Sequence, residues 1–445
     1  MKRSKADPLE REIERAFLPG EFIGDRSCYS LVEGLEAVAA RIAKLAADDP
    51  VRATSLYEVF LAGCHKKVNE LDDSSGEFGT FAQGLICAWI KARQAASSSP
   101  AETASRLLAW MDDDPYAFCY EIEKRVAKAF DKAGLLAFER IVRTRLDSAK
   151  PTGDLVRDYP LRRFGAVLRA VYTQQGDTGA YVALTEKTGL TPRDCHTLAT
   201  MLAARRKRED ALHWVERGMA LENESPRGWE AGSDLSILHR QLLVKLGREN
   251  EALGAAWAEY ASHPNKYSYE DLMNFVPEKE RSAWRQKALE AADTHGDLHS
   301  RIDLYLELKE MGRLAALARD TDLQALAGLS HFATEPAAAK LEKSHVDAAA
   351  RLWRAQGMRI VDGKKSKYYE AAVSNFSSAK RCYLKAGLAA EWEAAVQAVR
   401  AAHFRKAGFM AAFEAVVSGA SKQRQPSFLE EAKAAWSGRA KGGAS

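Results

Sequence analysis

The sequence predicts an all-α protein, an irregular α-solenoid built of helical hairpins. Apolar residues recur at three- to four-residue spacing along most of the chain, and alternating segments of strand length are almost absent. Helix starts and stops follow one another at intervals of roughly 15 to 30 residues, which is typical of helical hairpins. Alanine fills many of the intervening positions, and alanine has the lowest cost of any residue in a helix.

The apolar stripes identify helices in order along the chain. Residues three to four apart share one face of a helix, so we expect that face of each stripe to be buried. The stripes are Leu35, Val38, Ile42 and Leu45; Phe118, Ile122, Val126 and Phe130; Leu238, Leu242 and Leu246; and Leu253, Trp257 and Tyr260.

Capping residues mark where these helices begin and end. A hydroxyl or carboxylate before a proline, or three residues before an acid, is typical of a helix start, and glycine is typical of a helix stop. Starts are predicted at Asp49, Ser74 with Glu77, Ser99 with Glu102, Asp114, Thr191 with Asp194, and Ser427 with Glu430. Stops are predicted at glycines 134, 176, 189, 247, 296, 312, 357 and 387.

A degenerate internal similarity favours stacked hairpins. Residues 246–253 are similar to residues 311–317, and residues 206–212 and 386–392 are looser copies. In each segment one helix ends, a tight turn follows, and a second helix begins with small residues that permit close packing. We therefore expect tetratricopeptide-like hairpins over the C-terminal two-thirds, without a strict repeat length.

Two polar breaks divide the chain into segments. A Pro- and Gly-containing stretch at 147–154 and a softer Pro-Asn turn at 264–265 interrupt the helical pattern. The predicted segments are an N-terminal helical block (1–150), a hairpin-repeat region (151–262), a C-terminal repeat region (263–437) and a flexible tail (438–445).

Charge and composition exclude several classes of protein. The chain has 65 Lys and Arg against 61 Asp and Glu, a net charge of +4, which does not indicate a dedicated polyanion binder. Its 46% hydrophobic content excludes a wholly disordered chain. No apolar region follows the basic N-terminus and no run of 18 apolar residues exists, so we expect a cytoplasmic protein without a membrane partner. The six cysteines are scattered and predict free, buried thiols.

Several segments also carry a family resemblance. Together they resemble the helical body of bacterial SWIM zinc-finger-associated proteins, over residues from about 9 to about 417. A SWIM finger needs a Cys-x-Cys pair followed by Cys-x-His, and this chain has neither. The resemblance therefore implies the helical body only, and no contact made by the finger is carried over. The segments are 21–26 (EFIGDR), 71–79 (LDDSSGEFG), 110–114 (WMDDD), 367–372 (KYYEAA), 391–392 (EW) and 403–406 (HFRK).

No catalytic, cofactor-binding or metal-binding residues are predicted. The acidic turn at 72–77 fails the register of a calcium loop, and a helix end at Gly296 separates His295 from His299. Phosphate-binding loops, dinucleotide fingerprints and nucleophile elbows are absent. The sequence does not predict an enzyme, and an unrecognised enzyme stays only a third alternative.

Two basic clusters are the candidate contacts for nucleic acid or an acidic partner. The first lies at a predicted turn between helices, where its charges also offset a helix dipole. The second places cations beside tyrosines, a composition that can hold phosphates and stack bases, and a nearby helix with His403 extends it. The candidate residues are Arg205, Arg206, Lys207 and Arg208 in the first cluster, and Lys364, Lys365, Lys367, Tyr368, Tyr369, Arg405 and Lys406 in the second.

The predicted function is a non-catalytic interaction scaffold that binds another protein or a peptide segment on its solenoid surface. The alternative is a nucleic-acid-associated subunit that uses the basic segment near 364–369. The oligomeric state is left open. Five tryptophans beside charged residues (229, 257, 284, 353 and 392) are candidate interface anchors, although their spacing favours the core.

Overall fold

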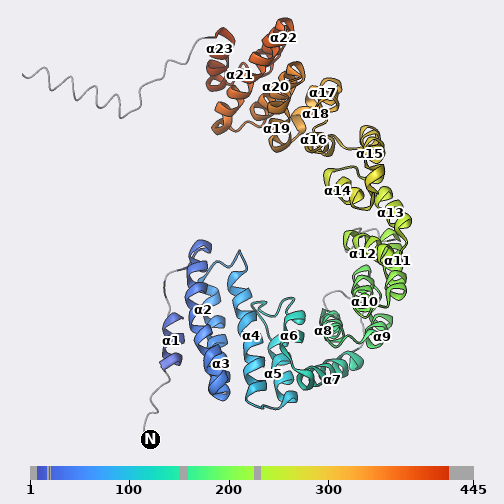
Figure 1. Cartoon of the computed structure of the whole chain (residues 1–445). Helices are drawn as coiled ribbons and strands as arrows, with labels where there is room; N and C mark the ends of the chain where they lie inside the picture. Colours follow the sequence, from blue (N-terminus) through green and yellow to red (C-terminus); the bar gives the residue numbers. More distant parts are fainter. Residues whose placement is uncertain (1–7, 18–19, 21, 150–158, 225–231, 420–445) are drawn as a thin grey trace, which may run out of the picture. The chain divides into compact units, whose positions relative to one another are not determined.

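The computed structural model describes residues 8–17, 20, 22–149, 159–224 and 232–419. The described chain is helical throughout, and apart from one isolated β-bridge these residues form no strand pairing. The chain divides into two compact units, residues 1–247 and 248–445 (Figure 1). The predicted all-α class is confirmed.

Unit 1 is a stack of helices in which each helix packs on a neighbour one or two places away along the chain. That pattern of local contacts is typical of a solenoid. Its helices are α1 (Pro8–Ala16), α2 (Asp25–Asp48), α3 (Pro50–Lys67), α4 (Glu77–Ala95), α5 (Pro100–Asp112), α6 (Glu123–Ala129), α7 (Lys132–Ser148), α8 (Tyr159–Gln175), α9 (Thr178–Thr188), α10 (Pro192–Ala204), α11 (Arg208–Glu224) and α12 (Gly232–Lys245), with a 3-10 turn η1 (Val68–Glu70).

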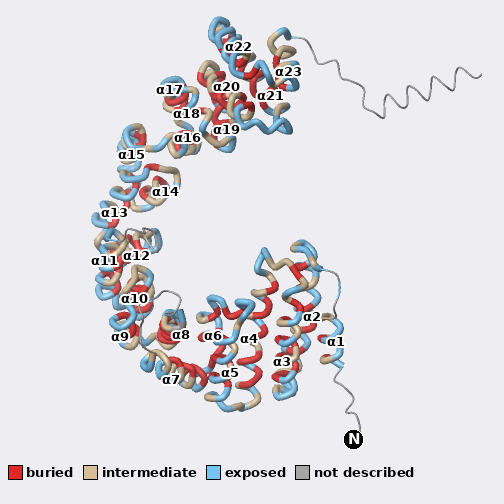
Figure 2. Tube along the Cα trace, turned by 180° about the vertical axis from the view of Figure 1, so that it is seen from behind, coloured by how far each residue is buried: buried red, intermediate tan, exposed pale blue. Residues whose placement is uncertain are grey.

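Unit 2 follows the same packing rule and has its own hydrophobic core, from Ala256 to Phe413. Buried residues of both units lie on the helix faces that meet their neighbours (Figure 2). The helices of unit 2 are α13 (Glu249–Ser262), α14 (Lys266–Phe275), α15 (Arg281–His295), α16 (Leu298–Glu307), α17 (Met311–Asp320), α18 (Leu323–Gly328), α19 (His331–Leu341), α20 (Val346–Asp362), α21 (Tyr369–Lys385), α22 (Ala389–His403) and α23 (Ala407–Ser418), with 3-10 turns η2 (Glu278–Glu280) and η3 (Ser366–Tyr368).

Three of the predicted helix starts are confirmed by their caps. The side chains of Asp49, Ser99 and Thr191 accept hydrogen bonds from backbone N–H groups of the first turns of α3, α5 and α10. At Thr191 the reciprocal bond from the N-cap backbone to Asp194 is also present, so the predicted capping box is complete. The predicted start at Ser427 lies outside the described residues.

The start of α4 differs from the prediction. Ser74 does not cap this helix, because the N-cap is Gly76 in the left-handed region (φ 74°). The carboxylate of Asp73 instead accepts hydrogen bonds from the N–H groups of Phe78 (2.9 Å) and Gly79 (2.8 Å). Asp72 binds Ser74, so the acidic pair organises the turn and the predicted Ser74–Glu77 box is wrong.

The segment after Asp114 is a turn rather than the predicted helix. The Asp114 carboxylate accepts hydrogen bonds from the N–H groups of Phe118 and Cys119, and Ala117 has a left-handed φ of 57°. The helix α6 begins only at Glu123. Phe118 and Ile122 are nevertheless buried, so the apolar stripe correctly identified core residues but misassigned the local backbone.

Glycine marks helix ends at five of the eight predicted positions. Glycines 176, 189, 247 and 387 have positive φ after a helix, and Gly296 is the C-cap of α15. Gly134 and Gly312 instead lie in the first turns of α7 and α17, and Gly357 lies inside α20. Those three predicted stops are wrong. A Cβ would come within 2.5 Å of Phe130 at Gly134 and within 2.8 Å of Phe376 at Gly357, so these two glycines serve close packing, whereas Gly312 has open space around it.

The predicted segment boundaries fall at the following places. Helix α7 ends at Ser148, and residues 150–158 of the first break lie outside the described residues. Asn265, at the second break, caps α14 and accepts hydrogen bonds from Tyr267 and Ser268. The predicted tail at 438–445 also lies outside the described residues.

Candidate functional site

Helices α2 and α4 of unit 1 begin side by side because a short bridge ties their N-terminal ends. Ile23 donates its N–H to the carbonyl of Glu70 (2.9 Å) and accepts from the N–H of Asp72 (2.8 Å). This parallel Ile23–Leu71 bridge joins the segment before α2 to the turn before α4. The two segments, 21–26 and 71–79, are among those that carry the family resemblance.

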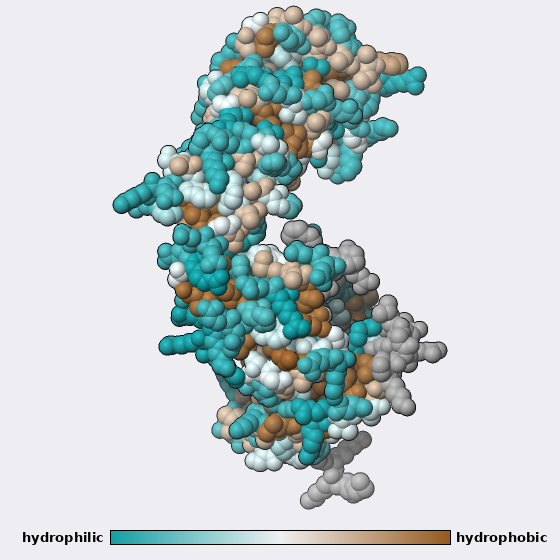
Figure 3. Space-filling model, turned by 90° about the vertical axis from the view of Figure 1, so that its right-hand side faces the viewer, coloured by the Kyte–Doolittle hydropathy of each residue, from teal (hydrophilic) through white to brown (hydrophobic). Residues whose placement is uncertain are grey.

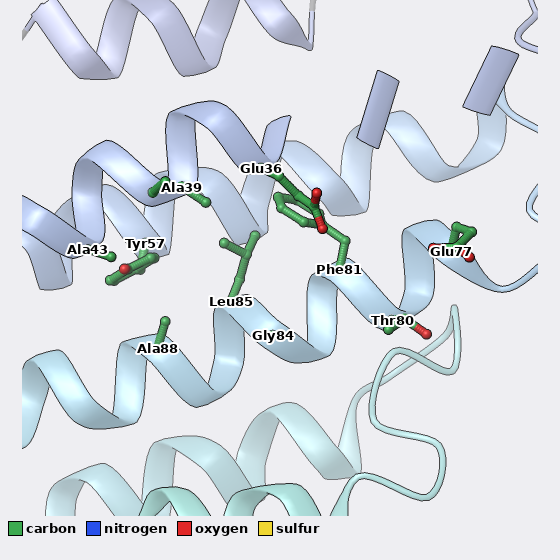
Figure 4. Close-up of a pocket in the computed structure, with 11 residues that line it drawn as sticks. Glu36, Ala39, Ala43, Tyr57, Glu77, Thr80, Phe81, Gly84, Leu85 and Ala88 are labelled. Atoms are coloured by element: carbon green, nitrogen blue, oxygen red, sulfur yellow. The ribbon is translucent and has the colours of Figure 1, made fainter. Parts of the chain in front are cut away.

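A groove follows α2 and α4 from this end, with α3 beneath it; we call it the α2–α4 groove (Figure 4). Its first half encloses about 420 Å³ and its second half about 460 Å³, and the two halves share Ala43, Tyr57, Gly84 and Ala88. On α2 the groove runs from Glu36 to Ala47, which at 1.5 Å per residue is roughly 17 Å or three turns.

The walls of the groove are made of small side chains and its floor of large buried ones. The floor consists of Tyr57 from α3 and Phe81 and Leu85 from α4, all buried. Figure 4 shows Tyr57 between Ala43 of α2 and Ala88 of α4. Small walls leave the helix backbones accessible to another backbone. The wall residues are Ala39, Ala40, Ala43, Ala46 and Ala47 on α2, and Thr80, Gly84, Cys87, Ala88 and Ala95 on α4.

Tyr57 is the polar group at the centre of the floor. Its side chain is only 2% exposed, and it lines both halves of the groove. Burial raises the pKa of this phenol above its ordinary value, so the hydroxyl is protonated at neutral pH. A ligand in the groove that supplies an acceptor can take a hydrogen bond from this hydroxyl.

The two ends of the groove carry opposite charge. Glu36 of α2 and Glu77, the first residue of α4, line the first half, and Lys91 of α4 lines the second half. Cys87 is half-buried in the second half, and burial raises its pKa although Arg125 and Lys91 act in the opposite direction. The groove is therefore apolar along its length and polarised at its ends.

Sequence reasoning missed this groove. Alanines at 39, 40, 43, 46 and 47 follow the helical period on a face beside the Leu35 stripe, and their composition by itself indicates only a good helix former. The same spacing also marks a face with little side-chain volume. Whether such a face is covered by another helix depends on tertiary packing.

The first basic cluster lies at the turn between α10 and α11, as predicted. Arg205, Arg206, Lys207 and Arg208 are all exposed, and Arg206 has a left-handed φ of 62°. Arg208 donates to the carbonyl of Lys245 at 2.8 Å, near the end of α12. Residues 201–210 contain no aromatic side chain.

The second basic cluster is brought together with the 403–406 segment, as the sequence suggested. Lys406 donates its ammonium to the carbonyl of Val361, and His403 lies 3.2 Å from Asp362, so the α22–α23 turn contacts the end of α20. Lys364, Lys365, Lys367 and Arg405 are exposed, whereas Lys406 is half-buried. Tyr369 turns inward against Phe409, and Tyr368 stays outside.

The remaining candidates have structural roles. His295 ends α15 and His299 lies in the first turn of α16, on a different helix. The described residues contain no group of three or more His, Cys, Asp or Glu side chains placed to hold a metal ion. All six cysteines are free and all but Cys87 are buried. No described helix is long and apolar enough to cross a membrane.

The tryptophans are partly core and partly surface. Trp392 is buried, whereas Trp257, Trp284 and Trp353 are half-buried. Lys287 lies over the rings of Trp257 (4.0 Å) and Trp284 (4.2 Å), and Trp353 donates to Glu342. Trp229 lies outside the described residues. On the face shown in Figure 3, hydrophobic side chains form small patches among hydrophilic ones.

Comparison with known proteins adds a family but no activity. No curated protein matches the chain. Among solved structures the chain is similar to one in "Structure of Naa15/Naa10 bound to HypK-THB", at 14% identity and a TM-score of 0.34 over 88% of this chain and 63% of that one. The chain therefore spans less than two-thirds of that neighbour's length.

A family model covers most of the chain, and its match includes the α2–α4 groove and the second basic cluster. The model is described as "Family of unknown function (DUF6880)" and matches residues 20–412. The chain thus belongs to the DUF6880 family.

Proposed function

We propose that this protein is an interaction scaffold whose α2–α4 groove binds an amphipathic helical segment of another protein. The observation that carries the proposal is the groove itself, a continuous apolar channel with small walls and a floor of large buried side chains that includes Tyr57. Laying an apolar helix face into such a channel is a recurring mode of peptide recognition.

The dimensions of the groove favour a helix as the occupant. A length of roughly 17 Å accommodates three helical turns, so the occupant presents apolar residues at i, i+3 or i+4, and i+7. Alanine and glycine walls let the occupant approach closely, with its larger side chains over Tyr57, Phe81 and Leu85.

The charges specify the occupant further. Glu36 and Glu77 favour Lys or Arg at the occupant's end that meets them, and Lys91 favours Asp or Glu near the other end. The Tyr57 hydroxyl favours an acceptor, such as a carboxamide or carboxylate, at the middle of the apolar face. The expected partner segment is therefore apolar on one face and oppositely charged at its two ends.

Gly84 and Gly34 provide a matched test. A Cβ at either position would meet no heavy atom within 4 Å, and both glycines are exposed on helices, but only Gly84 lines the groove. Gly84→Leu fills the groove and Gly34→Leu does not, while both changes improve helix propensity by up to about 1 kcal/mol. Any difference between the variants in partner binding therefore reports on the groove.

The experiment uses the full chain as bait, with quantitative mass spectrometry of co-purified proteins and alkylation of Cys87 as a direct readout of the groove. We expect a partner that is lost with Gly84→Leu, retained with Gly34→Leu, and able to slow Cys87 alkylation. Equal loss with both variants, or unchanged Cys87 alkylation in the complex, would reject the groove as the binding site.

Two finer points belong to the same proposal. We place the scaffold in the cytoplasm, because all six cysteines are free thiols and five of them are buried; cell fractionation with an antibody to the native protein tests this. We also propose a relation to the helical body of SWIM-associated proteins, which an alignment of both families over residues 21–26 and 71–79 tests.

A further inference from the structure

We propose that a second surface, in unit 2, binds single-stranded nucleic acid. This surface, the basic–aromatic patch, consists of Lys364, Lys365, Lys367, Tyr368, Phe404 and Arg405. It is separate from the α2–α4 groove and does not depend on it. Single-stranded nucleic acid is recognised by cations that bind phosphates and by exposed rings on which bases stack.

The patch combines two turns that are distant in sequence. Residues 364–368 follow α20, and Phe404 and Arg405 lie between α22 and α23. The contacts of Lys406 with the Val361 carbonyl and of His403 with Asp362 hold these turns together. The two turns therefore present their side chains at one end of the unit.

A buried aromatic group supports the patch from below. The ring of Phe409 lies 5.6 Å from Tyr369 and 6.3 Å from His403. Tyr368 and Phe404 are the chain neighbours of Tyr369 and His403, so packing of this group holds the backbone at both exposed rings. A backbone that is already ordered lowers the entropic cost of binding.

Each exposed ring is paired with a cation. Lys367 lies 4.9 Å from the Tyr368 ring centroid, and Arg405 lies 5.2 Å from that of Phe404. Tyr368 is 48% exposed and Phe404 is 65% exposed, which are large values for aromatic side chains. A base can stack on either ring while the neighbouring cation binds its phosphate.

The local charge favours an anion. The two turns and their flanking residues carry five cations, Lys364, Lys365, Lys367, Arg405 and Lys406, against two carboxylates, Asp362 and Glu370. This excess is concentrated in a chain whose total charge is only +4. An acidic peptide satisfies the cations but leaves both rings unused, so the rings favour nucleic acid over an acidic protein segment.

The first basic cluster provides the matched control. Arg205 and Lys207 are also exposed in a turn, but that turn contains no ring. Arg205→Glu with Lys207→Glu changes the charge of the chain as much as Lys364→Glu with Lys367→Glu does. Non-specific attraction depends on net charge, so both double variants weaken it equally. Binding at the basic–aromatic patch is weakened only by the 364/367 variant.

The test is a fluorescence-anisotropy titration of the full chain with labelled oligothymidylate of about 15 nucleotides, over a salt series. We expect log affinity to fall with log salt concentration with a slope of about −2 to −3, because single strands give about −0.7 per phosphate contact. Lys364→Glu with Lys367→Glu should weaken binding more than about tenfold, and the 205/207 control less than about twofold. Tyr368→Leu with Phe404→Leu should weaken binding at least about fivefold with little change in slope.

Four results would overturn the proposal. They are no binding at low salt, equal loss in the 205/207 control, equal or tighter binding of the duplex of the same length, and tighter binding of an oligoglutamate peptide. All substituted side chains are exposed, and circular-dichroism melting curves that overlay the wild type exclude misfolding as the cause of any loss.

Discussion

Gly357 of α20 lies directly against the ring of Phe376 of α21. A Cβ at position 357 would come within 2.8 Å of Cε2 and 2.9 Å of Cζ of that ring, and Phe376 is fully buried. The absence of a side chain at Gly357 therefore makes room for this ring. A glycine in the middle of a helix destabilises the helix by about 1 kcal/mol relative to alanine. Packing of the Phe376 ring against Gly357 offsets this cost.

We predict that Gly357→Ala destabilises unit 2 by about 1–3 kcal/mol although alanine is the better helix former, because the added methyl group overpacks the core. Gly34→Ala, at an open position of α2, should instead stabilise its helix by about 0.5–1 kcal/mol. Urea unfolding followed by circular dichroism measures both. Gly357→Ala with Phe376→Leu should recover part of the loss, and a stabilising Gly357→Ala would contradict the close contact.

Asp194 is the centre of a buried polar network in unit 1. Its carboxylate accepts from Arg169 (2.6 Å), Tyr181 (2.8 Å) and the Thr191 hydroxyl (2.8 Å), and the residue is 2% exposed. Burial alone would raise the pKa of Asp194, but the hydrogen bond and charge of Arg169 outweigh it, with help from Thr191 and Tyr181, and lower the pKa. The carboxylate is therefore charged and fully paired.

Asp194→Ala should cost about 3 kcal/mol, because it leaves the Arg169 guanidinium and the Tyr181 hydroxyl without their partner. Hydrogen exchange of peptides from α8 to α10 should report the loss locally. The control is Asp147→Ala, which removes an exposed ion pair with Lys187 (3.0 Å) and should cost less than about 0.5 kcal/mol. Equal effects of the two variants would rule out a special role for the network.

The stability of unit 2 should depend on pH because of the pair between Asp347 of α20 and Arg319 of α17. A two-point hydrogen bond from Arg319 of α17 (2.6 and 2.9 Å) lowers the pKa of Asp347 to about 2, against a slight opposing effect of burial. The folded pKa lies below the unfolded value, so the stabilisation is full above about pH 5 and is lost as the pH falls from about 4 to about 2.

We expect Asp347→Asn to lower the free energy of unfolding by about 1 kcal/mol at pH 7, because the ion pair is partly exposed and solvent screens it. The difference between wild type and variant should shrink below about pH 4 and vanish only below about pH 2. Urea midpoints measured over this range test it. A difference that grows on acidification would contradict the sign of the shift.

Cys87 should be the first of the six thiols to react with N-ethylmaleimide in the native protein. It is half-buried in the α2–α4 groove, whereas the other five cysteines are at most 4% exposed. Burial also raises the pKa of Cys64 and Cys119 to about 12, so few thiolates form at those positions. Peptide mapping after brief labelling identifies the modified residue.

Cys87→Ser should remove the fast phase of labelling and leave the slow phases unchanged, because the remaining thiols react only after local opening. Fast labelling at any other cysteine would show that Cys87 is not the most accessible thiol of the protein. The same measurement reports occupancy when a partner is present.

Much of the fold was predictable from local patterns. The stripe at Leu35, Val38 and Ile42 lies in α2 and is buried, and the caps at Asp49, Ser99 and Thr191 lie where their short-range hydrogen bonds require them. These features depend on neighbours within one or two helical turns. The second basic cluster and its contact with the 403–406 segment were also expected from composition.

The errors share a physical cause. The sequence around Asp114 contains a capping residue and a proline, but the same carboxylate also stabilises a turn, and packing of Phe118 and Ile122 selects the turn. Gly357 resembles a helix stop until Phe376 is placed beside it. In both cases two local structures are nearly equal in energy, and distant residues decide between them.

The sequence by itself determined the helical class, the free thiols, the balanced charge and the starts of α3, α5 and α10, because each depends on composition or on contacts a few residues apart. Only the tertiary structure decided that alanines of α2 and small residues of α4 face a common groove over Tyr57. Surfaces of this kind are made by residues far apart in the chain, and one sequence carries no record of which helix faces remain uncovered.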